Sequence, residues 1–426
     1  MKTSILIPIF NVQDCLKECI DSILQQVDVS KDDIDIVLVD DGSTDGSLDI
    51  AIEYAKKDER IFVLSKANGG PGPSTARNAA LELMKGTKLR EILEKNIQDE
   101  KYIIKSYEKR NSFDKSDEKY INAKELSKYF IQIQTRVYKT DLVDLNELIL
   151  QDLPEDVLIH HLDSDDYLDK RCISECLKNI KEKNVNIFMH NISTVDEDSN
   201  IVEDKAYLIG KKIKTGYYDS GLKMLEKNMI PNLWFTYQGM FKASLLNDFK
   251  LRFTNFLYHE DHDFAIILFA LSKKIFVCDE SLLYYRIRSG STMNSTKELE
   301  FPKTMPKSLQ HIKEEFDNFK DLRAYDRCLG FLTSFKEIYK IKNLFSRRLY
   351  KKIFHAQVGE FVLKYNKKIF NFKNEKETKK IIQLFKDIGI NININNIKLL
   401  YLKIKLRQFY RYPKLLFGIK KYDDEC

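Results

Sequence analysis

Residues 4–45 read SILIPIFNVQDCLKECIDSILQQVDVSKDDIDIVLVDDGSTD and contain two short apolar segments joined by an amphipathic one. Ser4–Ile9 and Asp35–Val39 are rich in β-branched and other apolar residues and have the length of buried strands. Between them, Asp14–Gln26 repeats its apolar residues at the spacing of one helical face. A strand, a helix and a second strand in this order predict a parallel pair with a right-handed crossover.

The same alternation continues further along the chain. We expect a second helix at Ser47–Lys56, a third strand at Ile61–Leu64 and a third helix that begins at Ser74. The pattern resumes at Val157–Leu162, which is another apolar run. These elements predict an α/β fold with a mostly parallel central sheet. Because ligands bind beyond the carboxyl ends of such strands, the loops that follow them are the places to look for chemistry.

Composition divides the chain into three parts. Residues 1–86 and 156–300 carry the α/β pattern and are expected to form one domain. Residues 87–155 contain no Gly and are dense in Lys, Glu and Asp, which favours a mostly helical insertion that lies outside the strand-end loops. Residues 301–426 hold 29 Lys and Arg against 13 Asp and Glu, and their pattern predicts a basic helical C-terminal region.

Composition also excludes several classes of protein. Hydrophobic residues make up 43% and charged residues 31% of the 426 residues, which is typical of a globular chain. No apolar run reaches the ~18 residues of a membrane-spanning helix, and the first residues do not resemble a secretory signal, so a cytoplasmic location is expected. The Cys pairs Cys15/Cys19 and Cys172/Cys176 allow a zinc site of four thiolates, but the missing CxxC spacing favours buried structural cysteines.

The strongest chemical signal is the acidic cluster Asp163-Ser164-Asp165-Asp166, which directly follows a predicted buried strand. Carboxylates at one strand end repel each other unless a cation or a proton offsets their charge, and Mn²⁺ and Mg²⁺ prefer such oxygen ligands. The alternative interpretation is an acidic cap for a helix at Tyr167–Lys181. The cluster alone leaves both interpretations open.

Two further loops follow predicted strands. Asp40–Ser47 reads DDGSTDGS, in which Asp and Ser can cap the next helix and a carboxylate can accept the imide N–H of a uracil ring. Asn68–Asn78 reads NGGPGPSTARN and leads into a helix whose first turns carry Arg77, a side chain that can contact a base or a phosphate. Taken alone, the Asp40–Ser47 loop is explained equally well as a turn.

The order of these motifs along the chain is more informative than any one of them. Besides the loops above, later segments with matching character are Asn232-Leu233-Trp234, His259-Glu260-Asp261 and Leu283–Ser291. Together the motifs resemble the family 2 glycosyltransferases of the GT-A fold, over residues 1–86 and 156–295. The resemblance therefore covers roughly half of the chain.

The resemblance implies a nucleotide-sugar site and a metal site. The residues that it places in the nucleotide-sugar site are Pro8, Phe10, Asn11, Asp40, Asp41, Arg77, Asp163, Ser164, Arg286 and Arg288. Among these, Asp41, with Asp40 behind it, and Arg77 would contact the uracil. Asp165 would be the direct ligand of Mn²⁺ or Mg²⁺, and Asp163 would contact the ribose or the metal.

The resemblance also implies a reaction. Asp261 would be the catalytic base with Glu260 beside it, and Trp234 would lie on the acceptor side. Arg286 and Arg288 would lie near the diphosphate. The implied activity is an inverting transfer of a sugar from a nucleotide-sugar, expected to be a UDP-sugar, to a glycan or lipid-linked glycan acceptor. The setting would be bacterial surface polysaccharide synthesis, of capsule or lipooligosaccharide.

Two features depart from the family pattern. The interval from Ala76 to Asp163 is much longer than in typical members, because it includes residues 87–155. The late His that serves some members as a metal ligand has no counterpart here, and His259 and His262 are better explained by local packing or solvent contact.

The last feature of the sequence is the basic segment Lys398–Lys421. Its Lys and Arg alternate with apolar residues, which suits either an anionic membrane surface or a helix packed on the body with a solvated basic face. Nucleic acid is not an expected partner, because no recognition fold accompanies the charge.

Two alternative functions fit the sequence less well. A nucleotidyltransferase would need a phosphate-binding loop where Ile9–Val12 stands, and an inactive binding module would not need the acidic motifs.

Overall fold

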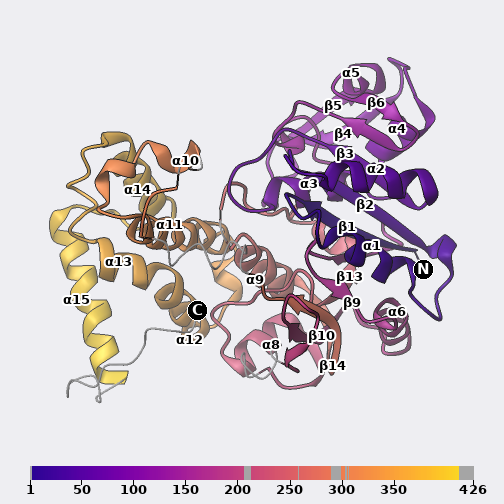
Figure 1. Ribbon diagram of the computed structural model, residues 1–426. Coiled ribbons are helices and arrows are strands. Elements are labelled where there is room, and N and C mark those ends of the chain that lie inside the picture. The colour runs from indigo at the N-terminus through magenta and orange to yellow at the C-terminus, as the bar shows by residue number, and fades with distance from the viewer. Residues whose placement is uncertain are drawn as a thin grey trace.

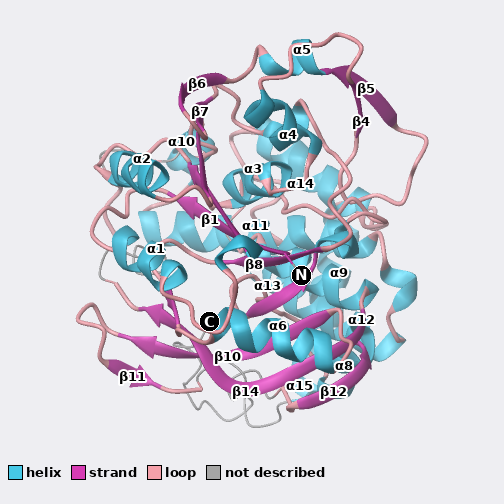
Figure 2. Cartoon of the chain, turned by 90° about the vertical axis from the view of Figure 1, so that its right-hand side faces the viewer, coloured by secondary structure: helices cyan, strands magenta, loops and turns pink. Residues whose placement is uncertain are grey.

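The computed structural model describes residues 2–205, 213–257, 259–288, 299–302, 305 and 307–411. Its centre is a 12-stranded sheet in the order β12-β14-β10-β13-β8-β1-β2-β3-β7-β6, with β11 beside β10 and β9 beside β14. Figure 2 shows this sheet running from β6 and β7 at one edge to β12 and β14 at the other. The strands are β1 (Lys2–Ile9), β2 (Ile34–Asp40), β3 (Ile61–Ser65), β6 (Ile131–Gln134), β7 (Val137–Lys139), β8 (Val157–His161), β9 (Tyr167–Leu168), β10 (Ile187–Val195), β11 (Ile201–Glu203), β12 (Gly216–Ser220), β13 (Gly239–Lys242) and β14 (Lys273–Arg286).

The five strands β8-β1-β2-β3-β7 are parallel and form the core of the sheet. Ile5 of β1 lies opposite Ile36 of β2 and His160 of β8. Every residue of β2 is buried, and so are all residues of β1 after Lys2. Strands covered on both faces become continuous apolar runs in sequence, which is why the parallel α/β sheet was predictable. The α/β prediction is confirmed.

Helices cover both faces of the sheet. They are α1 (Leu16–Leu24), α2 (Ser47–Lys57), α3 (Ser74–Leu83), α6 (Cys172–Glu182), α8 (Gly221–Asn228) and α9 (Asp261–Leu271). Successive residues of β8 show that α6 and α9 lie on opposite faces, because neighbouring strand residues point to opposite sides. His160 meets Cys172 of α6, whereas the next residue, His161, packs edge-on against Phe264 of α9.

The segment 87–155 is not the mostly helical insertion that its composition predicts. It contains α4 (Lys88–Lys95) and α5 (Ala123–Ser127), a separate hairpin of β4 (Ile103–Tyr107) and β5 (Glu118–Asn122), and the sheet strands β6 and β7. Val137 of β7 pairs with Val63 of β3, so the segment extends the central sheet. The Lys and Glu residues occupy exposed or partly exposed positions of these short elements, where side-chain packing selects only weakly for helix or strand.

The C-terminal region is helical, as predicted, and gathers on one side of the sheet domain (Figure 1). Its helices are α10 (Lys307–Gln310), α11 (Phe319–Tyr339), α12 (Arg347–Phe354), α13 (Glu360–Tyr365), α14 (Glu375–Asp387) and α15 (Ile394–Arg411), with a π-helical turn at His355–Gly359. The helix α11 packs against α9, which connects this region to the sheet domain. Among the described residues, none of the helices is both long and apolar enough to span a bilayer.

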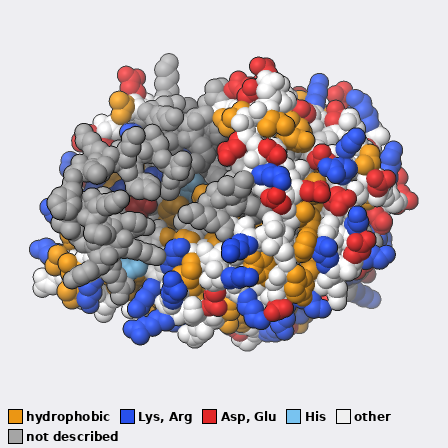
Figure 3. All heavy atoms as spheres, turned by 90° about the horizontal axis from the view of Figure 1, so that it is seen from below, with side chains coloured by type: hydrophobic (Ala, Val, Ile, Leu, Met, Phe, Trp, Pro, Cys, Tyr) orange, Lys and Arg blue, Asp and Glu red, His pale blue; other side chains and the backbone are white. Residues whose placement is uncertain are grey.

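Part of the predicted membrane-facing segment lies in α15. Ile397 and Ile404 are buried, whereas Leu399, Leu402 and Leu406 are exposed. Residues 412–421 of that prediction lie outside the described residues. When the whole molecule is seen from below, Lys and Arg side chains are interspersed with hydrophobic ones over the lower part of the visible surface (Figure 3).

Candidate active site

The loops after β1 and β2 are interlocked by hydrogen bonds. The backbone N–H of Thr44 donates to Asn11 Oδ1 over 2.8 Å, and the N–H of Val12 donates to Ser47 Oγ over 2.9 Å. Asn11 adopts a left-handed backbone with φ 51°, which Asn tolerates better than most residues. Its side chain is thus part of the loop architecture. Among its predicted neighbours, Phe10 is 50% exposed and Pro8 lies buried within β1.

The second loop places Asp40 and Asp41 in different surroundings. Burial raises the pKa of Asp40, whose carboxylate accepts hydrogen bonds from Ser43 N–H at 3.2 Å and Ser65 Oγ at 3.4 Å. Asp41 forms a buried ion pair with Lys66 and accepts the N–H of Gly69 over 3.0 Å. Lys66 follows β3 directly, and the sequence analysis missed it. A single Lys after an apolar strand was the only available signal.

Arg77 of α3 connects two motifs that are far apart in sequence. One guanidinium nitrogen lies 2.5 Å from Asp163 Oδ1, and another pairs with Glu260. The side chain is almost wholly buried and lies over the ring of Phe253. Burial alone would lower the pKa of Arg77, but the charges of Asp163 and Glu260 raise it. Arg77 thus bridges two carboxylates that face the guanidinium from different motifs, and its contact with uracil stays a prediction.

The acidic loop does not cap a helix. Strand β9 follows Asp166 directly, α6 begins only at Cys172, and the residue before that helix makes no side-chain cap bond. The helix predicted at Tyr167–Lys181 thus begins five residues later than expected. The alternative interpretation of the cluster as a helix cap is overturned.

Three carboxylates instead gather in this loop. Asp165 Oδ2 accepts hydrogen bonds from Arg288 Nη2 at 2.7 Å and Nε at 3.0 Å. Burial and the charge of Asp163 raise the pKa of Asp165, although Arg288 acts in the opposite direction. Asp166 Oδ1 accepts the N–H of Arg286 over 2.9 Å, and its buried Oδ2 has no hydrogen-bond partner among the described residues.

The carboxylates of this loop are of the ligand type that suits a hard divalent cation, although their oxygens do not all lie within 4.8 Å of one another in this structure. Burial and the charges of Asp165 and Asp163 raise the pKa of Asp166 well above its usual range, which reports crowded like charges. Carboxylate oxygens are the ligands that Mn²⁺ and Mg²⁺ prefer, and a cation would relieve the repulsion among them. Ser164 is buried within the same loop. The metal role of Asp163 and Asp165 stays a prediction.

The two predicted phosphate-binding arginines differ in surroundings. Arg286 donates to the backbone carbonyls of Asp165 and Glu197, each at 3.1 Å, and pairs with Glu18. Its three guanidinium nitrogens are thus all bonded to protein, so Arg286 fastens the acidic loop, and its place near the diphosphate stays a prediction. Arg288 contacts the Asp165 carboxylate directly, and its place near the diphosphate also stays a prediction.

The first residues of α9 hold the predicted acid pair. Glu260 is 4% exposed and is bonded to Arg77, whereas Asp261 is only partly buried. Burial and the charge of Glu260 raise the pKa of Asp261 well above its usual range. Two residues later, burial raises the pKa of Asp263 to about 8, although Thr254 Oγ1 donates to this carboxylate. The sequence analysis did not single out Asp263, because it lies in an apolar helical stretch.

An aromatic cluster borders the acid pair. The ring of Trp234 lies 5.2 Å from that of His262, which is fully buried. Phe331 of α11 stacks on His259 with ring centroids 5.4 Å apart. The packing role expected for the two His residues agrees with these contacts. The C-terminal region therefore contributes a side chain beside the acid pair.

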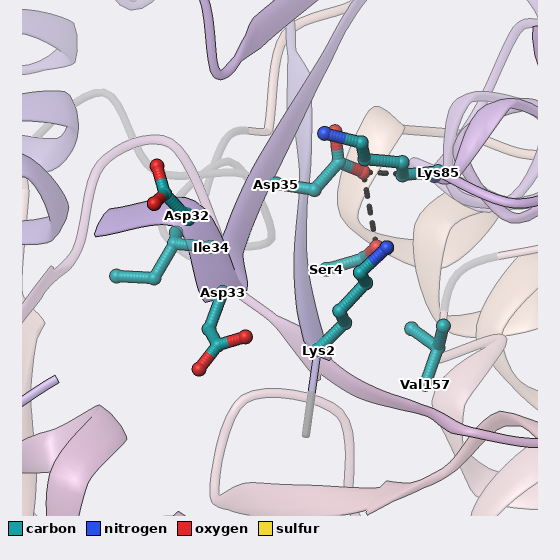
Figure 4. Close-up of a pocket in the computed structure, with 8 residues that line it drawn as sticks. All are labelled: Lys2, Ser4, Asp32, Asp33, Ile34, Asp35, Lys85 and Val157. Atoms are coloured by element: carbon teal, nitrogen blue, oxygen red, sulfur yellow. Dashed lines mark hydrogen bonds between the residues drawn. The ribbon is translucent and has the colours of Figure 1, made fainter. Parts of the chain in front are cut away.

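A small pocket lies elsewhere, at the amino ends of β1, β2 and β8 (Figure 4). Asp35 Oδ2 accepts Ser4 Oγ at 3.0 Å and the N–H of Lys85 at 2.9 Å there. Parallel strands carry their ligand sites at the carboxyl ends, so this pocket is at the wrong edge for the chemistry. Its buried hydrogen bonds give it a structural role.

Comparison with known proteins agrees with this arrangement. Residues 4–89 match the family model described as glycosyl transferase family 2. This segment is similar to family 2 glycosyltransferases. A poly(ribitol-phosphate) beta-glucosyltransferase of Bacillus spizizenii is 44% identical over 86 residues, which are 20% of this chain and 13% of that protein. The uncharacterized glycosyltransferase EpsJ of Bacillus subtilis is 48% identical over 84 residues, or 20% of this chain and 23% of the relative.

The structural comparison extends the likeness of the glycosyltransferase domain to the whole fold. A crystal structure of S. aureus TarS residues 1–349 with UDP-GlcNAc has a TM-score of 0.51 and 17% identity, covering 97% of this chain and 92% of that one. The fold is thus of the GT-A type. The chain spans about a quarter or less of the length of the first curated relatives.

Proposed function

We propose that this protein transfers a sugar from a UDP-sugar to a hydroxyl group of a glycan or lipid-linked glycan acceptor, with inversion and with Mn²⁺ or Mg²⁺ as cofactor. The transferred group would be a hexosyl or N-acetylhexosaminyl residue, in the synthesis of a bacterial surface polysaccharide. The observation that carries the proposal is the Arg77 bridge, which joins Asp163 of the acidic loop to Glu260 at the start of α9. One side chain thereby connects the donor loop to the start of the helix that carries the candidate base, Asp261.

The donor side is formed by loops after parallel strands. Asp41, paired with Lys66, would contact the uracil. The N–H of Asp41 donates to the carbonyl of Ile9 over 2.8 Å, and the next residue, Phe10, offers an exposed ring. Asp163 and Asp165 would hold the cation, which when bound supplies positive charge to the leaving diphosphate. Arg288 lies on Asp165 and is placed to neutralise the same phosphates. Arg286 fixes the backbone of that loop.

The acceptor side is formed by Asp261 and Trp234. An acceptor hydroxyl must lose its proton as its oxygen attacks the anomeric carbon, and a carboxylate with a raised pKa is a suitable proton acceptor. Asp261 has this property and is more exposed than Glu260. An aromatic ring next to the base suits the apolar face of a sugar, which supports Trp234 as an acceptor contact.

Two other activities fit less well. A nucleotidyltransferase needs a phosphate-binding loop after the first strand, but Asn11 there is committed to Thr44 of the next loop. A module without activity would have no use for a buried Arg77 bridge between acids, which costs desolvation energy. The proposed location is the inner face of the cytoplasmic membrane, with α15 against anionic lipid, because its exposed Leu residues alternate with Lys.

The direct test is a panel of UDP-, GDP- and dTDP-sugars incubated with the full chain and Mn²⁺, without acceptor. We expect slow release of UDP from a UDP-sugar and loss of this release in EDTA. Release of no nucleotide from any donor would contradict the transferase proposal. Full release in EDTA would contradict the metal assignment alone.

A further inference from the structure

A second cluster of ligating side chains lies away from the acidic loop, on the face of the sheet that α6 covers. His160 belongs to β8, His190 belongs to β10, and Cys172 is the first residue of α6. All three side chains are fully buried. The two strands flank β13, so the imidazoles converge across one intervening strand.

The hydrogen bonds of the two imidazoles fix which nitrogen faces inward. Nδ1 of His160 lies 2.6 Å from the carbonyl oxygen of His161, and Nδ1 of His190 lies 2.7 Å from that of Asn191. A carbonyl only accepts, so each Nδ1 carries a proton and donates. Each neutral imidazole then presents the lone pair of Nε2, and such outer bonds are what orient metal-binding His residues.

These lone pairs point into one small space. The two Nε2 atoms are 3.5 Å apart, and each is 3.8 Å from Cys172 Sγ. Two lone pairs that face each other in a buried site repel, and neither can donate to the other. A cation among the three atoms removes this repulsion.

The distances match those around a zinc ion. Zn–N bonds of about 2.0–2.1 Å and Zn–S bonds of about 2.3 Å separate two nitrogens by ~3.4 Å and nitrogen from sulfur by ~3.6 Å at tetrahedral angles. The separations in the cluster differ from these values by about 0.2 Å or less. Imidazole and thiolate are also the ligand types that Zn²⁺ prefers.

We infer that His160, Cys172 and His190 bind Zn²⁺ in a buried structural site. Cys176 is also buried, one helical turn after Cys172, but its sulfur does not belong to the group of three ligand atoms within 4.8 Å of one another. Cys172 is thus more than the buried structural cysteine that its sequence suggests. Cys15/Cys19 does not join it, because Cys19 Sγ lies 3.7 Å from the carbonyl of Asp163 instead.

The position of this site indicates a structural role for the metal. His160 precedes the acidic loop Asp163–Asp166, and Cys172 follows it. A metal held by both residues would fasten the two ends of the donor loop to the sheet. Zinc is therefore a positioning element for the proposed donor site, and it differs from the Mn²⁺ or Mg²⁺ of that site in both ligands and place.

The test is the metal content of the full chain, expressed with added zinc and freed of loose metal by gel filtration. We expect about one zinc per chain in the wild type, and at least about tenfold less in Cys172→Ser. Cys328→Ser, which alters another buried thiol, and Asp261→Asn, which alters the separate His259–Asp261–His262 group, should both keep the zinc. Equal zinc in wild type and Cys172→Ser, or none in wild type, would overturn the inference.

A second measurement covers the case in which Cys172→Ser does not fold. Wild-type protein exchanged into Co²⁺ should develop the thiolate-to-metal charge-transfer band of a cysteine ligand, and a strong chelator should lower its Tm. Absence of both changes would overturn the site independently of any variant. Because neither readout depends on sugar transfer, failure of the zinc site is distinguishable from failure of the proposed function.

Discussion

Replacing the two adjacent acids at the start of α9 should separate chemistry from structure. Adjacent residues at a helix start point about 100° apart, so only one of Glu260 and Asp261 can face an acceptor. Glu260 is engaged by the buried Arg77, and Asp261 is the more exposed of the two. Asp261→Asn should therefore remove the proton acceptor while leaving the Arg77 bridge intact.

The expected magnitudes follow from these contacts. General-base assistance is worth roughly 10²–10⁴-fold, so Asp261→Asn should slow UDP release by about this factor with donor affinity within a few-fold. Its stability should not fall, because the neutral amide ends the repulsion with Glu260 that raises the pKa of Asp261. Glu260→Gln keeps an oxygen for Arg77 but loses the charge, which should cost about 1.5–3 kcal/mol of unfolding free energy.

The assay is UDP release with water as acceptor, which needs the same proton acceptor as transfer to a sugar. Donor affinity by calorimetry and urea unfolding accompany it for both variants. In the wild type, the rate should rise with pH until the raised pKa of Asp261 is passed, because only the carboxylate form accepts a proton. Near-normal release by Asp261→Asn, together with loss of release by an equally stable Glu260→Gln, would refute Asp261 as the base and assign that role to Glu260.

Four further changes test other parts of the molecule. Asp165→Asn should abolish Mn²⁺-dependent donor binding measured by calorimetry, and unchanged binding would remove it from the metal site. Joining Gly86 to Glu155 through a short linker removes β7, which pairs with β3, and should therefore prevent cooperative unfolding in circular dichroism. If the shortened protein kept the wild-type Tm, the segment would not be part of the core. Removing residues 398–426 should weaken sedimentation with anionic vesicles but spare UDP release, and equal sedimentation would exclude the membrane role. The pKa of Asp263 is raised to about 8, so between about pH 4 and 8 the folded state keeps a proton that the unfolded state has lost. The free energy of unfolding should therefore fall by up to about 1.4 kcal/mol per pH unit in this range. Asp263→Asn should flatten this slope in urea unfolding, and an unchanged slope would contradict the prediction.

The sequence predicted those parts of the fold that depend on local periodicity. The strands β1, β2, β3 and β8 are apolar runs of strand length, and each was placed within about two residues. The strands of residues 87–155 were missed because they are short and half-exposed, so their Lys and Glu residues carry no strand period. The start of α6 was placed too early because β9 occupies only two residues, which is too short to leave a pattern.

The sequence motifs predicted candidate site residues, but they did not predict which residues contact one another. Asp163, Asp165 and Asp261 were recognisable because each lies after a strand or at the start of a helix. Lys66, which pairs with Asp41, and Asp263, which accepts from Thr254, were not recognisable, since they belong to no motif. The His160–Cys172–His190 cluster was hidden for the same reason, because its two strands are joined only through β13.

The Arg77 bridge illustrates why the site needs the whole fold. Its two carboxylate partners lie 86 and 183 residues further along the chain, so no periodicity can connect them. Burying one cation between two acids is costly unless each charge is matched, and a missing partner leaves an uncompensated buried charge. The bridge thus forms only when α3, the acidic loop and α9 are all in place. In the proposed enzyme the donor loop and the base helix are therefore assembled together, and loss of either should displace the other.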